Sequence, residues 1–285
     1  METFINKVSI HCTRKGAELK GGEPMFTIGA IGAGKKGMPI LDAAVTALSL
    51  EPSSIVVYDL DPNRSRQARS RQFVVAGNEA EVYANSKILL LAIPSQIEVA
   101  ESLLEKLACC KKWCPRHKRV VINVIHGVSS GLIKKYLGKD IEVINAVPTM
   151  GKTKGKVIFT HTSNTQDENL NIVAKIFAAT GEFEMVSEPS LRKILSVDEY
   201  SQGYSRYFME AIARAATEAG IEYNLAIRMV SRGFISAAEQ ILNSPYQFLP
   251  EPHTNESIVD RSVRHFEAKK VGNSISEGVK LCIKP

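Results

Sequence analysis

The sequence lacks any apolar run approaching the roughly 18 residues that a membrane-spanning helix needs, so we predict no membrane location. Residues 1–24 carry scattered charges and no apolar central stretch, and they do not look like a secretory signal peptide. Cysteine is scarce, and its count of five is odd. Without an expected secretory signal, this indicates reduced thiols in a cytoplasmic protein rather than a disulfide framework.

Aromatic residues make up only 7% of the chain, and they do not alternate with the basic residues that give the net charge of +6. This spread of charge argues against a nucleic-acid partner and fits a solvated surface or attraction for an anionic cofactor. A metal site is not predicted either. Cys110, Cys114 and His117 have ligand-like spacing, but no fourth ligand is evident nearby.

What the sequence does contain is a glycine-rich turn within residues 28–37. A short apolar run, which predicts a buried strand, ends in Gly32-x-Gly34-x-x-Gly37, and an apolar helical pattern follows over residues 41–48. Gly32 allows the tight turn, Gly34 lets a pyrophosphate approach the backbone, and Gly37 lets the helix pack on the strand. The start of the helix offers free N–H groups to phosphates. The pattern predicts a dinucleotide site.

A second apolar run at residues 55–58 completes a strand–helix–strand unit and ends at Asp59, where a ribose-binding acid belongs. Asp59 would accept a hydrogen bond from a ribose 2′-hydroxyl and repel a 2′-phosphate, which favours NAD. Arg64, five residues on, would instead clamp a 2′-phosphate and favour NADP. The sequence is compatible with either cofactor, and Asp59 slightly favours NAD.

Further buried strands are expected at residues 87–94, 120–125 and 142–149, with helices between them. This alternation predicts an α/β fold, an N-terminal Rossmann domain with a doubly wound parallel sheet over residues 25–188. Ligands in such sheets bind beyond the carboxyl ends of the strands. The predicted cofactor-binding residues are therefore Gly32, Ala33, Gly34, Lys35, Lys36, Gly37, Asp59, Arg64, Ala92, Ile93 and Pro94.

From Leu191 onward the apolar residues follow helical spacing, which predicts an all-α C-terminal domain over residues 189–285. Asp198 is a candidate N-cap for its long first helix, Gly220 is expected to end that helix, and Gly272 is a candidate break in the tail. Residues 1–24 are read as an appendage to which the sequence assigns no chemistry.

Five segments of the chain resemble the pyrroline-5-carboxylate reductases, which catalyse the last step of proline synthesis. They are residues 28–34, 89–96, 121–129, 146–150 and 208–221. The resemblance implies an NAD(P)H-dependent oxidoreductase that transfers hydride to the C=N bond of a cyclic imine, a small-molecule substrate. It also implies that the helical domain makes a homodimer.

The chain departs from that family where the substrate binds. Asn145 stands where an arginine is usual, and residues 253–258 replace a loop with two more glycines. Losing those glycines removes backbone freedom that an anion-binding loop needs, and Glu256 would repel a carboxylate. These differences predict altered substrate-binding motifs.

The candidate catalytic residues are His126, Tyr204, Thr254 and Ser257. A protonated imine is already a good hydride acceptor, so the protein mostly positions the reactants and relays a proton. Each residue also has a structural interpretation. His126 would bond to the backbone at a strand end, and Tyr204 would pack in a helix core.

Two other functions remain open from the sequence. Lys193 lies near the start of the long helix, as does the catalytic lysine of the β-hydroxyacid dehydrogenases, and a lysine there would protonate a carbonyl oxygen. That similarity suggests an alcohol or ketone oxidoreductase. The altered substrate motifs also allow a regulatory protein that binds NAD(P) without turnover.

Overall fold

The computed structural model describes residues 26–110, 119–149, 155–243 and 258–283. The predicted appendage at residues 1–24 lies outside these ranges. Contacts between residues divide the chain into two compact units, Met1–Leu191 and Arg192–Pro285.

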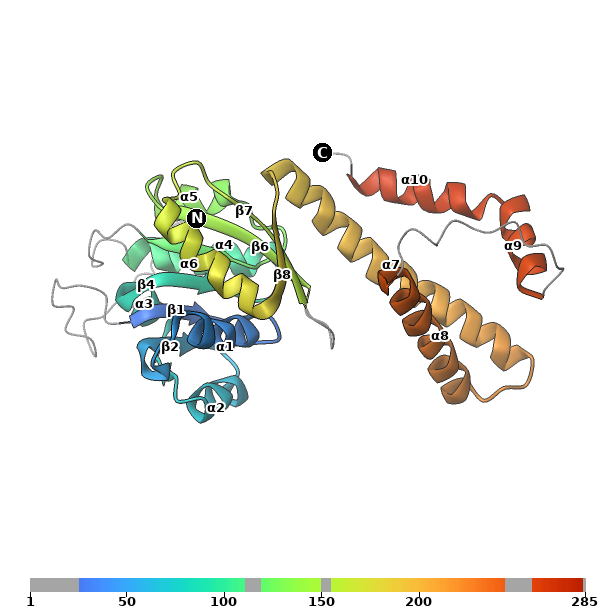
Figure 1. Cartoon of the computed structure of the whole chain (residues 1–285), viewed down its shortest axis with the longest axis horizontal. Helices are drawn as coiled ribbons and strands as arrows, with labels where there is room; N and C mark the ends of the chain where they lie inside the picture. Colours follow the sequence, from blue (N-terminus) through green and yellow to red (C-terminus); the bar gives the residue numbers. More distant parts are fainter. Residues whose placement is uncertain (1–25, 111–118, 150–154, 244–257, 284–285) are drawn as a thin grey trace, which may run out of the picture. The chain divides into compact units, whose positions relative to one another are not determined.

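The first unit is built on an eight-stranded sheet with the order β3-β2-β1-β4-β5-β6-β7-β8 (Figure 1). Its strands are β1 (Phe26–Ile31), β2 (Ile55–Tyr58), β3 (Val74–Val75), β4 (Ser86–Leu91), β5 (Val120–Asn123), β6 (Glu142–Thr149), β7 (Gly155–His161) and β8 (Gly181–Met185). The α/β prediction is confirmed, with one reversal. β7 runs antiparallel to β6, because the short connection between these strands leaves no room for the crossover that parallel pairing needs.

Helices cover both faces of this sheet, and their apolar sides form two separate cores. One core contains side chains from α1 (Gly37–Leu48), α2 (Pro62–Ser70) and α6 (Asp167–Thr180). The other contains side chains from α3 (Glu79–Asn85), α4 (Ile97–Cys110) and α5 (Ser130–Leu137).

Strand β4 explains why both cores are needed. Ile88 and Leu90 point into the first core, and Leu89 and Leu91 point into the second. Successive side chains of a strand point to opposite faces, so an uninterrupted apolar run is stable only when both faces are covered. The run therefore places β4 in the middle of the sheet, next to β1.

The second unit consists of helices (Figure 1). They are α7 (Glu188–Glu218), whose first residues belong to the first unit, α8 (Tyr223–Asn243), α9 (Ile258–Ala268) and α10 (Val271–Ile283). Gly220 ends α7 as predicted: its φ is +94°, and its N–H donates to the carbonyl of Thr217 at 3.0 Å.

Two predictions about these helix ends are wrong. Asp198 lies well inside α7, because the helix already begins at Glu188, so it does not cap the helix. Gly272 is the second residue of α10, and the break precedes it at Lys270, whose φ is +54°. A glycine is well tolerated in a first turn, where the intrahelical hydrogen bonds of the backbone N–H groups have not yet begun.

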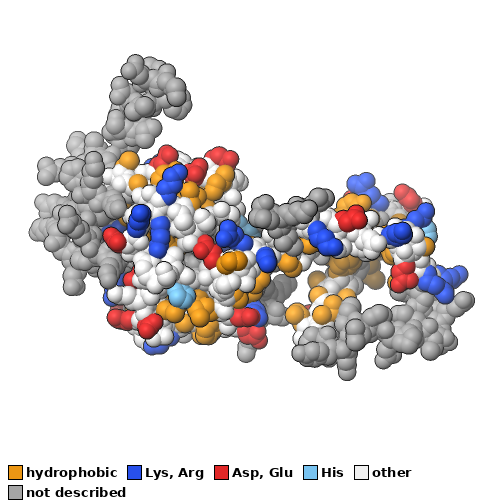
Figure 2. Space-filling view, turned by 90° about the horizontal axis from the view of Figure 1, so that it is seen from above, with side chains coloured by type: hydrophobic (Ala, Val, Ile, Leu, Met, Phe, Trp, Pro, Cys, Tyr) orange, Lys and Arg blue, Asp and Glu red, His pale blue; other side chains and the backbone are white. Residues whose placement is uncertain are grey.

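The helical unit leaves many apolar side chains at its surface (Figure 2). Tyr207 and Leu242 are 72% and 75% exposed, and Met229 and Ile235 are each more than half exposed. Among the described residues, none of the helices is both long enough and apolar enough to span a membrane.

Candidate dinucleotide site

The glycine turn between β1 and α1 has a backbone geometry that other residues would not tolerate. Gly32 has φ +95°, and its N–H donates to the carbonyl of Tyr58 at 2.9 Å. A side chain on Gly32 would collide with the backbone carbonyl of Ala92, and one on Gly37 would collide with the carbonyl of Gly32. The turn is therefore tight, and α1 packs closely against it.

A cleft of about 740 Å³ opens beside this turn. A Cβ atom added at Gly34 would meet no protein atom within 4 Å, so the space next to its backbone is open. The cleft brings together predicted residues from three separate loops, namely Gly32, Gly34, Lys35, Lys36, Asp59, Arg64, Ala92, Ile93 and Pro94. Gly37 and Ala33 belong to the same turn, but both are buried and neither lines the cleft.

Asp59 holds two of these loops together. Its Oδ2 atom accepts a hydrogen bond from the N–H of Ala33 at 2.7 Å, and its Oδ1 atom accepts one from the N–H of Asp61 at 2.9 Å. The carboxylate therefore links the glycine turn to the start of α2. It does so at the carboxyl end of β2, where the sequence predicted a ribose-binding acid.

The cleft also contains an ion pair that the sequence did not predict. The Nζ atom of Lys106 on α4 lies 2.8 Å from Oε1 of Glu79 on α3. Burial acts to raise the pKa of Glu79, but the hydrogen bond from Lys106, a backbone hydrogen bond and the charge of Lys106 together outweigh it and lower the pKa overall. The pKa of Tyr58, which also lines the cleft, is raised by burial and by the charge of Glu79.

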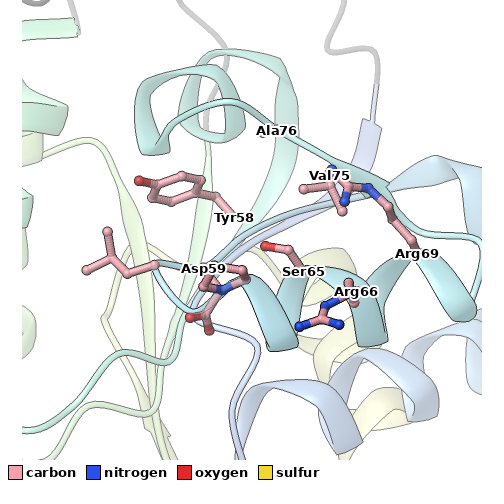
Figure 3. A pocket seen from close by; sticks show the side chains of 9 residues that line it. Tyr58, Asp59, Ser65, Arg66, Arg69, Val75 and Ala76 are labelled. Atoms are coloured by element: carbon pink, nitrogen blue, oxygen red, sulfur yellow. The ribbon is translucent and has the colours of Figure 1, made fainter.

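A second cavity of about 420 Å³ lies behind Asp59, between α2 and β3 (Figure 3). It shares Tyr58, Asp59 and Leu60 with the cleft. Its remaining walls come from α2 and from the region of β3, and they are Pro62, Ser65, Arg66, Arg69, Val75 and Ala76. The arginines Arg66 and Arg69 thus face this second cavity, and Arg64 faces the cleft.

His126 follows β5 at the same end of the sheet as the cleft, in a turn held by a buried amide. The Nδ2 atom of Asn123 donates to the carbonyl of Val128 at 2.9 Å and to Oδ1 of Asn145 at 3.0 Å. The Oδ1 atom of Asn123 accepts from the N–H of Ile125 at 3.2 Å. His126 is half-buried and is not among the residues that line the cleft.

The other catalytic candidates lie beyond the first unit. Tyr204 is half-buried on α7, where its ring stacks on Tyr200 at a centroid distance of 6.1 Å. A side chain on Gly278 of α10 would lie 2.8 Å from the Tyr204 hydroxyl, so Tyr204 packs between two helices. Lys193 is exposed on α7. Thr254 and Ser257 are outside the described residues.

Glu79, Lys106 and Tyr58 had no signal in the sequence. Glu79 and Lys106 are 27 positions apart and belong to different helices, and nothing in either local pattern indicates that the fold brings them to one cleft.

Within the described part of the chain, no group of three or more His, Cys, Asp or Glu side chains is arranged to hold a metal ion.

The fold and the cleft define a class of protein, a Rossmann-type dinucleotide-binding unit joined to a helical unit. The sheet order, the positive φ at Gly32 and the acid at the end of β2 all belong to that class.

Comparisons with known proteins find relatives that are pyrroline-5-carboxylate reductases. Pyrroline-5-carboxylate reductase of Escherichia coli K12 is 24% identical over 219 residues, which are 76% of this chain and 80% of that protein. A pyrroline-5-carboxylate reductase structure from Coxiella burnetii matches with a TM-score of 0.69 at 19% identity, over 91% of this chain and 96% of that one.

The Plasmodium falciparum pyrroline carboxylate reductase with NADP bound matches with a TM-score of 0.68 at 15% identity, over 92% of this chain and 97% of that one. No family model matches the sequence. The chain is a divergent relative of the pyrroline-5-carboxylate reductases, as its motifs suggested.

Proposed function

We propose that the protein is an NAD(P)H-dependent reductase that transfers hydride to the C=N bond of a cyclic imine. The observation that carries this proposal is the cleft beside the glycine turn in a chain whose curated relatives are pyrroline-5-carboxylate reductases along three quarters of its length. The substrate is pyrroline-5-carboxylate or another cyclic imine that the altered motifs accept.

The cleft fits a nicotinamide dinucleotide. Gly32 and Gly34 provide the open backbone that a pyrophosphate needs, Lys35 and Lys36 add positive charge, and Asp59 is placed to accept a ribose hydroxyl. When bound, the reduced nicotinamide supplies the hydride. Ala92, Ile93 and Pro94, just past β4, line the same cleft.

Little acid catalysis is required of the protein, because a protonated imine accepts hydride readily once it is held in place. We assign His126 to orienting the substrate or relaying a proton, since it follows β5 at the cofactor end of the sheet. Tyr204, Thr254 and Ser257 are assigned to the substrate side by resemblance to the family.

The substrate side differs from the family at Asn145. This residue is 7% exposed, and its side chain accepts a hydrogen bond from Asn123. The longer, charged arginine that is usual there would not fit this buried amide pair without rearrangement.

We further propose that the protein acts in the cytoplasm as a homodimer formed through the helical unit. The exposed apolar side chains of α7 and α8 support the dimer, because monomeric proteins rarely expose so many large apolar residues along neighbouring helices. The test is size in solution, where a monodisperse monomer at micromolar concentration would overturn the dimer.

The test of the activity is oxidation of NADH and of NADPH, measured separately, with pyrroline-5-carboxylate and a panel of other cyclic imines. Rapid turnover of pyrroline-5-carboxylate would assign the protein to proline synthesis. Turnover of a different imine alone would assign the changes at Asn145 and at residues 253–258 to a changed substrate. Turnover of ketones but not of imines would contradict the proposal and favour the chemistry considered for Lys193.

A further inference from the structure

The carboxylate of Asp59 is fixed in place at the ribose end of the cleft. Each of its oxygens accepts a backbone hydrogen bond, from Ala33 at 2.7 Å and from Asp61 at 2.9 Å. Rotation of the side chain out of the cleft would break both bonds and leave the half-buried N–H of Ala33 without a partner. A ligand must therefore be compatible with a negative charge at this position.

The N-terminus of α2 offers no substitute site for a phosphate. Asp61 caps this helix, and its Oδ1 atom accepts the N–H of Asn63 at 2.8 Å. A carboxylate thus already occupies the position at which a helix N-terminus would attract an anion. Asp61 also lines the cleft and adds a second negative charge beside Asp59.

Two of the cations that line the cleft, Arg64 and Lys106, already have partners. Nη1 of Arg64 donates to Oε1 of Gln67 at 3.2 Å, and its Nε lies 4.0 Å from Oδ2 of Asp61. Lys106 is paired with Glu79 at 2.8 Å. To bind these cations, a 2′-phosphate would have to break their present contacts. It would also lie next to the negative charge of Asp59.

The unit does have further arginines on α2, but they face the second cavity (Figure 3). Nη2 of Arg66 donates to Oδ1 of Asn63 at 2.6 Å. Tyr58, Asp59 and Leu60 line both cavities, whereas Arg66 and Arg69 line the second cavity and not the cleft.

We propose that the cleft selects NADH over NADPH and that Asp59 is the specificity-determining residue. The preference arises mostly because the Asp59 carboxylate repels the 2′-phosphate of NADPH. The 2′-hydroxyl of NADH can donate a hydrogen bond to a carboxylate that is already in place, whereas the 2′-phosphate of NADPH brings two negative charges against it. This inference rests on the proposed function only in requiring that the cleft bind a nicotinamide dinucleotide.

The experiment is equilibrium binding of NADH and of NADPH to the purified full chain, without an imine, followed by the fluorescence of the reduced nicotinamide. We expect NADH to bind at least about tenfold more tightly, since like charges placed together strongly disfavour a partner. NADPH affinity equal to or above that of NADH would overturn the proposal.

Variants identify the residue responsible. Asp59→Asn should narrow the NADH preference, chiefly by strengthening NADPH binding, and Asp59→Ser serves if the asparagine variant melts at a much lower temperature. The matched control is Arg66→Ala combined with Arg69→Ala, which changes the same region without touching the carboxylate and should leave the preference unchanged. A preference that survives removal of Asp59, or that depends on the two arginines, would overturn the assignment.

The same measurement separates this inference from the proposed function. Selective binding of NADH in a protein that reduces no imine would support the selectivity and contradict the reductase activity. Imine reduction with equal use of both cofactors would support the reductase activity and contradict the selectivity. Absence of binding by either cofactor would overturn both.

Discussion

In the sheet unit, the central strands bury their apolar side chains on both faces, whereas α7 and α8 of the helical unit leave theirs largely exposed. Leu89, Leu90 and Leu91 on β4 are each 0% exposed. Among the described residues from 192 onward, the buried apolar side chains are Ala213 and Ala226. The sheet unit contains its own core, whereas the described part of the helical unit buries almost none of its large apolar side chains.

Because the two units differ in how much apolar surface they bury, they should be stabilised in different ways. Burial of apolar surface is the main favourable term in folding, and a unit that does not bury its own apolar surface gains little from it. The sheet unit, which carries the cleft, is therefore expected to be stable by itself. The helical unit is expected to depend on a second copy of the chain.

The largest effect should come from placing charges on the exposed face of α8. Met229 and Ile235 are 59% and 58% exposed, so replacing both with glutamate costs little in an isolated protomer. In a dimer, the same change buries carboxylates in an apolar interface, which costs several kcal/mol per ion. We expect the wild-type protein to sediment as a dimer and the double variant as a monomer.

The control for this change is Met229→Leu, which alters the same face but keeps it apolar. It should leave the dimer intact. If the wild type and the double variant have the same assembly state, then this face of α8 lies outside any interface, and a dimer through α8 is ruled out.

In the sheet unit, truncating a buried side chain should cost far more stability than truncating an exposed one. Leu90→Ala removes a fully buried side chain from the first core and should lower the free energy of unfolding by about 3 kcal/mol. Leu60→Ala removes the same atoms from a position that is 85% exposed and should change it by less than about 0.5 kcal/mol. Urea denaturation of both variants without cofactor measures the two values, and similar values would contradict the burial assigned to β4.

The features that could be predicted from the sequence are those encoded within a short stretch. The glycine turn, the double-sided apolar run of β4 and the helix end at Gly220 each depend on neighbouring residues and on backbone geometry. The order of strands and helices follows from the same local patterns. For this reason the α/β class and the location of the cleft were both predictable.

The features that were missed depend on residues brought together by the fold. The pairing of Glu79 with Lys106 requires α3 and α4 to pack side by side. The Asn123–Asn145 contact requires the register of β5 on β6, which places these two residues opposite each other. Likewise, the position of Asp59 was predictable, but its bond to Ala33, which fixes the carboxylate, appeared only in three dimensions.

The smallest effect concerns an exposed polar contact between α7 and α8. Oε2 of Glu210 accepts a hydrogen bond from the Tyr223 hydroxyl at 2.6 Å, and its Oε1 accepts one from Nε of Arg214 at 2.8 Å. The bond from Tyr223, followed by that from Arg214, lowers the pKa of Glu210 below its ordinary value of 4.5.

A carboxyl whose pKa is lowered in the folded state stabilises the fold above its unfolded-state pKa, and it loses this effect as pH falls through the folded value. Glu210→Gln should therefore slightly lower the melting temperature at pH 7 and make melting less dependent on pH below about 4.5. Glu218→Gln, at the end of the same helix, is the control. Because the contact is exposed, salt should weaken the difference between the two variants. A Glu210→Gln protein that melts like the control at every pH would show that the hairpin is held by apolar contacts alone.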